Sequence, residues 1–441
     1  MALLLALKKS PLRPQILVAP GSDAMSDLAT CYPQLKVEDL TGLVQLAQEA
    51  AVDLCIVGPE VPLALGLVDA LEATGIPSFG PRQAAARIES SKAYAKNLMA
   101  QAGIPTAGYQ TYTSRASALA ALDNWDFPLV LKENGLKAGK GVAICQTKAE
   151  AQDHIADLDL SEDNPLLFED FLQGFEFSLI CLASGEKFLP LPVAQDYKAI
   201  FDGQQGPNTG GMGAVSPLPR LSGQVYQEAI DQVIQPTLRA LAADHSSFTG
   251  FLYAGLMATD TGVKVIEFNA RMGDPEAEVI LPRLQGDLLT AICQLLGLET
   301  DPTVSPGDPA VPAQTGLGSH SDFPLAGTEQ GEAQIFPVTP HTCLGVVLSS
   351  PGYPGKVTDY LVIPQAFFEA AQAEGLEVIH MGTRKVPAGY QAAGGRVLML
   401  TSQGQDIAHC REQIYSFLRD QQALIADFHY RTDIGLAALE T

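Results

Sequence analysis

The amino-acid sequence predicts an α/β protein, α+β in parts, with a substantial hydrophobic core. Between residues 15 and 80, short apolar runs alternate with amphipathic stretches, which is typical of parallel strands separated by helices. Further along, two pairs of longer apolar runs are joined by glycine-containing turns, which indicates antiparallel hairpins. Apolar residues make up 46% of the 441 residues and charged residues 17%. A chain of this length and composition is expected to fold as about three domains.

The first 83 residues are expected to form a doubly wound, Rossmann-like domain. Two apolar runs, at 15–19 and 53–57, end at prolines and glycines as buried parallel strands do. Ligands of such sheets bind outside the carboxyl ends of the strands. The second run is followed by Gly58, Pro59 and Glu60, so a ligand is expected there. Helical periodicity is present at residues 40–51 and 63–73.

The rest of the chain divides where its composition changes. Residues 84–300 open with an alanine-rich helix, at 84–102, and continue mainly as strands. Hairpins are expected at 128–147 and 251–268. A proline- and glycine-rich linker is expected at 301–343, followed by a small α/β domain at 344–441 with strands near 344–348, 376–380 and 396–401.

The charge of the chain excludes two classes of partner. The sequence has 27 basic and 50 acidic residues, which gives a net charge of −23. An acidic surface repels phosphate backbones and anionic lipids, so no nucleic acid and no membrane is expected as a partner. No apolar run approaches the ~20 residues of a membrane span. Seven scattered cysteines without a CxxC pair indicate reduced thiols and a cytoplasmic protein.

A loop rich in glycine and lysine, inside the 128–147 hairpin, is the strongest sign of chemistry. It runs from Lys132 to Val142 and includes Gly139, Lys140 and Gly141. Glycines let backbone N–H groups approach phosphate oxygens, and lysines neutralise the phosphate charge. It is not a Walker loop, because a glycine and then a strand follow Lys140. The alternative interpretation is an ordinary hairpin turn, which the three glycines and three lysines disfavour.

A carboxylate and an amide stand two residues apart near the end of the last predicted strand. Glu267 and Asn269 flank Phe268, and the two-residue period of a strand puts both on one face. Such oxygen ligands suit a Mg²⁺ ion that bridges nucleotide phosphates. Arg271, Asp274 and Glu276 follow in a loop, where they could grip a small charged substrate. The alternative interpretation is a solvated strand end.

Two further segments are compatible with ligand binding but carry little information alone. The glycine-rich segment 206–213 permits close backbone approach, and carboxylates flank the apolar run at 168–176, which could hold adenine and ribose. No Ser-His-Asp, Cys-His or HExxH arrangement supports a hydrolase.

Taken in order, these segments resemble the phosphoribosylamine–glycine ligase family of ATP-grasp enzymes. The resemblance covers nearly the whole chain, and the ordered combination of motifs is highly specific. The motifs that carry it lie at 57–60, 91–94, 132–142, 195–198, 206–213, 250–256, 267–276, 352–355, 394–397 and 430–435.

The resemblance implies an architecture. An ATP-grasp domain at 84–300, with a lid at about 108–172, would follow the N-terminal domain at 1–83. The linker at 301–343 and the small C-terminal domain at 344–441 would complete the chain.

The resemblance also implies an ATP-dependent carbon–nitrogen ligase of de novo purine synthesis. ATP would phosphorylate the carboxylate of glycine, and the amine of 5-phosphoribosylamine would attack the glycyl phosphate. The products would be glycinamide ribonucleotide, ADP and phosphate. A monomer that uses ATP with Mg²⁺ or Mn²⁺ is expected, and its partners are expected to be small-molecule substrates only.

Matched motif by motif, the resemblance implies roles for single residues. ATP would be bound by Lys92, Lys132, Gly139, Lys140, Gly141, Glu169, Phe171, Leu172 and Glu176. The metal ion would be held by Glu267 and Asn269. Glycine and the ribosyl amine would face Gly58, Pro59, Glu60, Asp196, Lys198, Asn208, Thr209, Gly210, Gly211, Met212, Arg271 and Asp274. The groups that act during the reaction would be Arg271, Asp274 and Lys140.

The sequence departs from the family's pattern at several places. Met1 begins about where a His-Ala-Leu motif lies in the family, so the family's first strand and glycine loop are expected to be missing, which would leave the N-terminal domain truncated. At Ala199 the family's second basic residue of Gln-Asp-His-Lys-Arg is lost. Two alternatives therefore stay open: an inactive nucleotide-binding paralogue, and an ATP-grasp ligase with a different amine or acid substrate.

Overall fold

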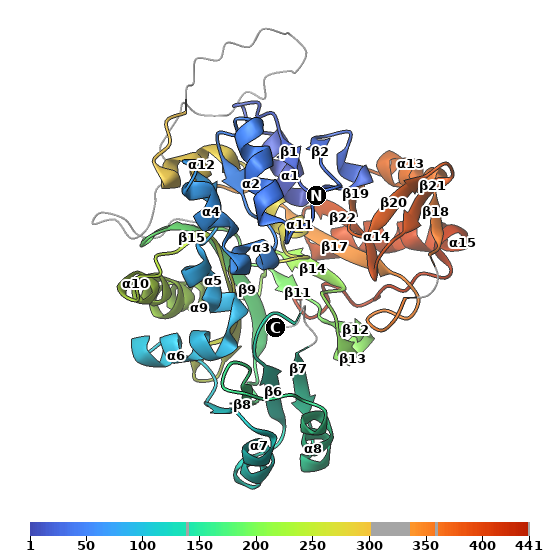
Figure 1. Ribbon diagram of the computed structural model, residues 1–441. Helices are drawn as coiled ribbons and strands as arrows, with labels where there is room; N and C mark the ends of the chain where they lie inside the picture. Colours follow the sequence, from blue (N-terminus) through green and yellow to red (C-terminus); the bar gives the residue numbers. More distant parts are fainter. Residues whose placement is uncertain (138–140, 301–335, 358–359, 440–441) are drawn as a thin grey trace.

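The computed structural model describes residues 1–137, 141–300, 336–357 and 360–439. Figure 1 shows an N-terminal region in blue, a long green sheet through the centre, a C-terminal region in orange and red, and a small lobe projecting at the bottom. This mixed architecture is the α/β class with α+β parts that the sequence predicts.

Short parallel strand pairs form the N-terminal region. β1 pairs with β2 and β3 with β4, both in parallel, as the alternation of strands and helices predicts. Among the described residues the two pairs share no hydrogen bonds, so β1 and β3 each keep an open edge, and both strands line one cavity. The elements are α1 (Ala2–Lys8), β1 (Leu17–Val18), β2 (Thr30–Cys31), α2 (Leu40–Glu49), β3 (Cys55–Ile56) and β4 (Ser78–Phe79).

Two helices that the sequence predicts as continuous are each broken in the structure. The helix expected at 63–73 is divided into α3 (Glu60–Leu65) and α4 (Leu67–Glu72) by Gly66, whose φ of 88° is left-handed. The helix expected at 84–102 is divided into α5 (Gln83–Ser90) and α6 (Lys92–Ala102). Ser91 is extended there, and its hydroxyl accepts a bond from the Tyr94 N–H. The second break therefore starts a new helix at Lys92.

The projecting lobe is a four-stranded antiparallel sheet with two helices, called here the lid lobe (residues 109–170). Its strands run in the order β5-β8-β6-β7. The predicted hairpin is confirmed, with Lys132 of β6 opposite Val142 of β7. A separate hydrophobic cluster, which includes Phe168, holds the lobe together. The elements are β5 (Tyr109–Tyr112), α7 (Arg115–Ala121), β6 (Leu129–Glu133), β7 (Val142–Cys145), α8 (Lys148–Ala156) and β8 (Leu166–Asp170).

The central sheet has the strand order β10-β9-β15-β16 and is antiparallel throughout. The predicted hairpin of β15 and β16 is confirmed. Helices α5 and α9 pack against β16, and α12 packs against β9. The elements are β9 (Phe175–Ser184), β10 (Lys187–Pro190), β12 (Ala199–Phe201), β13 (Gln205–Asn208), α9 (Gly223–Ala229), α10 (Gln235–Ala243), β15 (Thr249–Thr259), β16 (Gly262–Asn269), α11 (Ala277–Ile280) and α12 (Leu288–Leu296).

The C-terminal region has a small antiparallel sheet of its own, in the order β18-β21-β20, but its main sheet is shared with the central region. Its strands β17, β22 and β19, close to where the sequence predicts them, extend a sheet that begins with β11 and β14, in the order β11-β14-β17-β22-β19. The elements are β11 (Gln195–Asp196), β14 (Gly213–Ser216), β17 (Thr342–Ser349), β18 (Val362–Pro364), α13 (Gln365–Ala373), β19 (Glu377–His380), β20 (Thr383–Val386), β21 (Gly389–Ala392), β22 (Arg396–Gly404), α14 (Ile407–Asp420) and α15 (Gln422–Ile425).

Most of the predicted linker, at 301–335, lies outside the described residues. Its last part packs on the central region, where the N–H of Phe336 donates to the carbonyl of Pro190 at 2.8 Å. All seven cysteines are free thiols, as expected. In the described part of the chain, every helix is too short or too polar to cross a membrane.

Candidate active site

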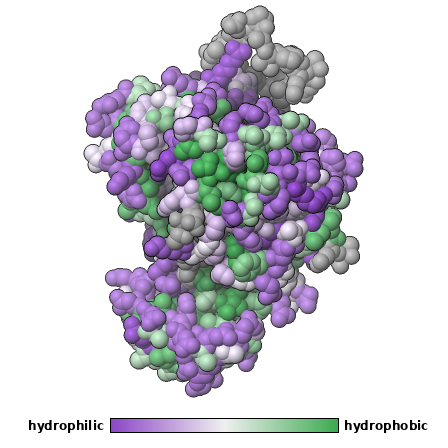
Figure 2. Space-filling view, turned by 90° about the vertical axis from the view of Figure 1, so that its right-hand side faces the viewer, coloured by the Kyte–Doolittle hydropathy of each residue, from purple (hydrophilic) through white to green (hydrophobic). Residues whose placement is uncertain are grey.

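A large cavity of about 2080 Å³ collects most of the residues that the sequence singles out. Figure 2 shows part of it as the hollow between the lid lobe, at the bottom, and the rest of the molecule, with hydrophobic side chains gathered inside. The predicted residues that line it are Gly58, Pro59, Glu60, Lys92, Lys132, Gly141, Glu169, Phe171, Leu172, Glu176, Asp196, Lys198, Asn208, Thr209, Gly210, Glu267, Asn269, Arg271 and Asp274.

Four predicted residues are not among the lining residues. Gly139 and Lys140 lie outside the described part of the chain. Met212 is fully buried, and its N–H donates to the carbonyl of Tyr197. Gly211 is also buried, and its φ of 106° suits only glycine. Gly211 and Met212 therefore stabilise the conformation of the 206–213 segment without lining the cavity.

Lys92 faces the glycine loop from the first turn of α6. Its ammonium donates to the carbonyl of Gly135 at 2.9 Å, next to the segment that the sequence assigns to phosphate. Burial lowers the pKa of Lys92, and nearby Lys132 and Lys137 lower it further, against the attraction of Glu267. An anion bound here would relieve this repulsion between cations.

A buried triad of two lysines and one glutamate forms the inner wall of the lid side. Glu169 Oε2 lies 2.8 Å from the Lys96 ammonium and 3.0 Å from that of Lys132. Lys132 also donates to the carbonyl of Ile266, and Lys96 to Thr106 Oγ1, both at 2.8 Å. Glu169 Oε1 is buried, and no donor in the described part of the chain bonds to it. Since unpaired buried acceptors are costly, this oxygen is available to a donor on a ligand.

Lys198 is surrounded by three carboxylates on the opposite side of the cavity. It forms a salt bridge with Glu176 and lies 3.9 Å from Glu267 Oε1. Burial alone would lower the pKa of Lys198, but Asp196, Glu176 and Glu267 hold it well above its ordinary value. Burial raises the pKa of Asp196 despite the nearby Lys198. The Lys198 ammonium therefore stays protonated between Glu176, predicted for ribose, Glu267, predicted for the metal ion, and Asp196, predicted for the substrate.

Glu267 and Asn269 lie on one face of β16, as the sequence predicts. Burial would raise the pKa of Glu267, but Lys198, Lys132, Lys92 and Arg271 together lower it. The carboxylate is therefore ionised, and a third of its side chain is exposed to the cavity. An ionised carboxylate beside an amide fits a divalent cation that also takes phosphate oxygens as ligands.

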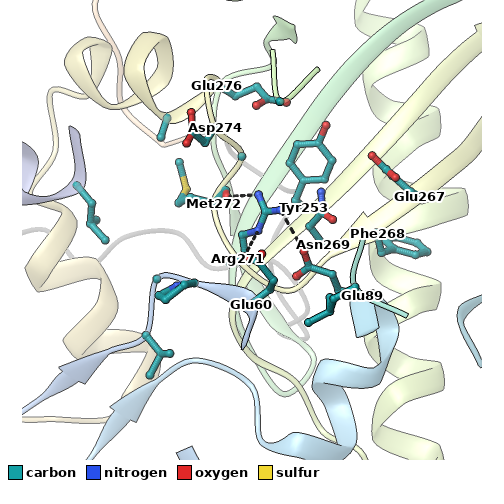
Figure 3. A pocket seen from close by; sticks show the side chains of 18 of the residues that line it. Glu60, Glu89, Tyr253, Glu267, Phe268, Asn269, Arg271, Met272, Asp274 and Glu276 are labelled. Carbon is teal, nitrogen blue, oxygen red and sulfur yellow. Dashed lines mark hydrogen bonds and ion pairs between the residues drawn. The ribbon is translucent and has the colours of Figure 1, made fainter. Parts of the chain in front are cut away.

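Arg271 is held between two carboxylates from different parts of the chain (Figure 3). Its guanidinium lies 3.6 Å from Glu60, at the start of α3, and 3.1 Å from Glu89, at the end of α5. These neighbours raise the pKa of Arg271 despite its burial. Glu89 also accepts a bond from the Ala270 N–H and, with the Asn269 amide oriented to satisfy its donors, from Asn269. The N-terminal region thus helps to fix the loop after β16.

The loop that contains Asp274 and the glycine segment 206–213 are joined by a C-terminal residue. Arg396, at the start of β22, contacts the Asp274 carboxylate at 2.9 Å and donates to the carbonyl of Gly210 at 2.6 Å. Thr209 completes the loop, since its N–H and hydroxyl both donate to the carbonyl of Lys198.

Several residues of the cavity wall are absent from the sequence-based site. Lys96, one turn from Lys92 in the predicted helix, and Tyr253 and Arg396, inside motifs of the resemblance, could have been included. Glu276, which the sequence analysis places beside Arg271 and Asp274, does line the cavity: it accepts a bond from the buried Ser178, and that hydroxyl also meets the Tyr253 hydroxyl at 2.9 Å. Glu89 gave no signal, because nothing local distinguishes it from a solvated helix residue.

The arrangement suits transfer of a charged group rather than attack by a protein nucleophile. Cations and carboxylates alternate along the cavity and fix one another. Cys55 lines the cavity, but burial raises the pKa of its thiol to about 11, so it is not an activated nucleophile. Phosphoryl transfer needs charge neutralisation and alignment, which such walls provide.

Comparisons with known proteins agree with this geometry. Three family models match: the phosphoribosylglycinamide synthetase N domain at residues 1–89, its ATP-grasp (A) domain at 90–277 and its C domain at 343–437. A phosphoribosylamine–glycine ligase from Halalkalibacterium halodurans is 39% identical over 431 residues, covering 96% of this chain and 91% of that protein. One from Lactococcus lactis is 38% identical over 432 residues, covering 98% and 95%.

The fold is similar to that of a solved relative. The crystal structure of a phosphoribosylamine–glycine ligase from Thermotoga maritima has a TM-score of 0.76 at 25% identity and covers 98% of this chain and 97% of its own. Identity above 35% along nearly the entire length, together with this fold, shows the family. The chain belongs to the phosphoribosylamine–glycine ligase family.

Proposed function

We propose that the protein is an ATP-dependent carbon–nitrogen ligase that joins glycine to 5-phosphoribosylamine. The products are glycinamide ribonucleotide, ADP and phosphate, in de novo purine synthesis. The observation that carries this proposal is that Lys92, Lys132, Lys198 and Arg271 line one cavity with Glu267, where the Lys198 ammonium lies 3.9 Å from the Glu267 carboxylate and the four cations together lower the pKa of that carboxyl. Such a centre neutralises a transferring phosphoryl group and aligns it with an acceptor.

The nucleotide half of the site is assigned to the lid side. Lys92 and the glycine loop neutralise phosphates, and the free oxygen of Glu169 accepts a hydrogen bond from the base. Glu176 binds the ribose. Glu267 and Asn269 hold Mg²⁺, or Mn²⁺ in its place, which would screen the phosphate charge.

The substrate half is assigned to the opposite wall. Arg271 fixes the orientation of the acid substrate, and Asp274 with the 208–212 loop contacts the amine. Because Arg271 is itself held by Glu60 and Glu89, its position is set before a substrate binds.

Three further properties follow as proposals. Free thiols at all seven cysteines suit a reducing cytoplasm. The strongly acidic composition suits a protein that acts on small molecules alone and remains a monomer.

The test is phosphate release by the full chain with ATP, Mg²⁺, glycine and freshly generated 5-phosphoribosylamine. Release that requires both glycine and the amine supports the proposal. ATP binding without any turnover would instead identify an inactive nucleotide-binding paralogue. Turnover that needs a different acid or amine would identify a ligase with changed specificity, an outcome motivated by the apolar Ala199 beside Lys198.

A further inference from the structure

The C-terminal region reaches the substrate half of the cavity through two side chains, Arg396 and Tyr353. The guanidinium of Arg396 forms two 2.9 Å contacts with the two carboxylate oxygens of Asp274. It also donates to the carbonyls of Gly210, at 2.6 Å, and Asp274, at 3.2 Å. The hydroxyl of Tyr353 accepts a bond from the Gly210 N–H at 2.9 Å. Both polar groups of the Gly210 backbone are therefore bonded to the C-terminal region.

Glycines allow this close contact. A Cβ atom on Gly210 would lie 3.1 Å from the guanidinium carbon of Arg396, tighter than ordinary van der Waals contact. A Cβ on Gly395 would overlap the ring of Tyr353, and one on Gly211 would overlap Pro275. The two loops and the C-terminal residues are thus packed backbone against side chain.

The contacts of Arg396 and Tyr353 with Gly210 and Asp274, called here the clamp, are supported by a β-sheet. Arg396 opens β22, which is hydrogen-bonded to β17, and β17 is hydrogen-bonded to β14, which directly follows the glycine segment. Arg396 and the glycine segment that it contacts are therefore attached to strands of the same sheet. A forked pair of this kind specifies orientation as well as charge, which a lysine cannot reproduce.

We propose that Arg396, assisted by Tyr353, is a positioning residue. It fixes the position of residues 208–212 of the glycine segment and of Asp274, so that they can contact the glycine and amine substrates. The inference rests on the proposed function and deepens it, since it makes the C-terminal region part of the specificity of the substrate half. The polar side-chain contacts of Arg396 and Tyr353 with the site reach Gly210 and Asp274, whereas the nucleotide half is built mainly from α6, the lid lobe and β16.

The main experiment compares Arg396→Met with the unaltered full chain in steady-state kinetics. We expect the KM for glycine or for the amine to rise about 10- to 100-fold, because a loop displaced by an ångström loses much of its alignment. The KM for ATP should stay within about twofold. Arg396→Lys should recover only part of the loss, and Tyr353→Phe should give a smaller effect in the same direction. Unchanged KM values for both substrates would overturn the proposal.

A matched control separates this effect from a general loss of charge. Arg384, an exposed arginine of β20 in the same region, is replaced in Arg384→Met, which should leave all kinetic constants unchanged. Combining Arg396→Met with Asp274→Asn should cost less than the product of the two single effects, because they remove the same contact. Multiplicative effects would contradict the clamp.

A second measurement does not depend on turnover. In hydrogen exchange followed by mass spectrometry, Arg396→Met should speed exchange in the peptide that contains Gly210, at least about tenfold, while the peptide with Lys92 is unchanged. If the unaltered protein is active and Arg396→Met exchanges no faster than it, the clamp alone is rejected. Faster exchange in Arg396→Met, together with no turnover of glycine and the amine by the unaltered protein, would reject the proposed function alone.

Discussion

At the scale of single residues, Glu267 is the acid around which the cations of the cavity gather. Glu267→Gln keeps the shape but removes the charge that four basic side chains stabilise. If Glu267 holds the metal ion, we expect kcat to fall by about 100-fold or more, with a raised Mg²⁺ requirement. Both quantities are measured by glycine-dependent phosphate release during a Mg²⁺ titration.

The control for this prediction is Glu186→Gln, which removes an exposed carboxylate from the turn between β9 and β10. It should leave kcat and the Mg²⁺ requirement unchanged. A Glu267→Gln protein that needs no more Mg²⁺ than the unaltered protein would show that the ion is held elsewhere.

Lys96 makes the nucleotide half sensitive to pH. Burial lowers the pKa of Lys96 to about 8, despite the attraction of Glu169, whereas a solvated lysine stays charged to about 10.4. As the pH rises through about 8, Lys96 loses its proton, and the site loses a positive charge and a charged donor to Glu169. ATP binding should therefore weaken about 3- to 10-fold between pH 7 and pH 9.5.

Equilibrium ATP binding at several pH values checks this prediction. Lys96→Met should bind ATP weakly at every pH and lose most of the alkaline decline. Lys187→Met, at an exposed position of β10, should keep the full decline. An identical pH profile in Lys96→Met and the unaltered protein would assign the decline to another group.

Much of this site is predictable from sequence because its residues stand in short motifs. Glu267 and Asn269 share a face through the local period of a strand, and Lys132 follows from its place before a glycine loop. Glu89 is different, and so is the ion pair of Lys96, although Lys96 itself is one turn from Lys92: the partners, Arg271 and Glu169, are distant in the chain. No local pattern encodes such a pairing, since it depends on how whole elements pack.

At the scale of elements, the start of α6 links helix stability to the nucleotide half. Ser91 caps the helix through Tyr94 and meets Asn134 Oδ1 at 3.3 Å, and Asn134 also accepts from the Ala93 N–H. Ser91→Ala should lower the free energy of unfolding by about 1 kcal/mol. It should also raise the KM for ATP, because Lys92 is the first residue of this helix. Urea denaturation and steady-state kinetics measure the two effects.

Ser114→Ala provides the comparison. Ser114 caps α7 in the same way, through the Ser117 N–H at 3.2 Å, but it is exposed and is not among the residues that line the cavity. It should cost similar stability without changing the KM for ATP. Equal kinetic effects of the two substitutions would remove the special role of α6.

The breaks in the helices show where element prediction fails. Periodicity continues across Gly66 and Ser91, so a pattern of apolar residues alone joins α3 to α4 and α5 to α6. The signals that divide them are backbone features: a left-handed glycine and an extended, capping serine. The strands near 344, 376 and 396 are predicted well, because short apolar runs between turns are a strong local signal.

At the scale of the whole molecule, the five-stranded sheet joins parts that the sequence suggests are separate domains. β14 pairs with β17, although more than a hundred residues lie between them. Composition locates the start of the C-terminal strands but not their partner. The structure therefore joins the C-terminal region, through this sheet, to the glycine segment that we assign to the substrate half.

Arg431 is the buried tie between the C-terminal end and this substrate half. Its guanidinium makes two 2.7 Å bonds to Asp433 and donates to the Ala199 carbonyl, at 3.0 Å, and to Gln204, at 2.9 Å. The side chain is fully buried, with a relative exposure of 0%. Removing one partner of such a network leaves buried acceptors unpaired, so Arg431→Met should cost about 3–5 kcal/mol of stability.

Urea denaturation, read by far-ultraviolet circular dichroism, measures this loss, and Arg419→Met is its control. Arg419 pairs with Glu412 at 3.2 Å, but both side chains are more than half exposed, so that substitution should change stability by less than about 1 kcal/mol. Arg431 donates hydrogen bonds to Ala199 and Gln204 in and beside the β12–β13 hairpin, which connects Lys198 to Asn208. We therefore also expect Arg431→Met to raise the KM for the amine. A denaturation midpoint equal to that of Arg419→Met would mean that the five-stranded sheet, without Arg431, holds the C-terminal region to the rest of the protein.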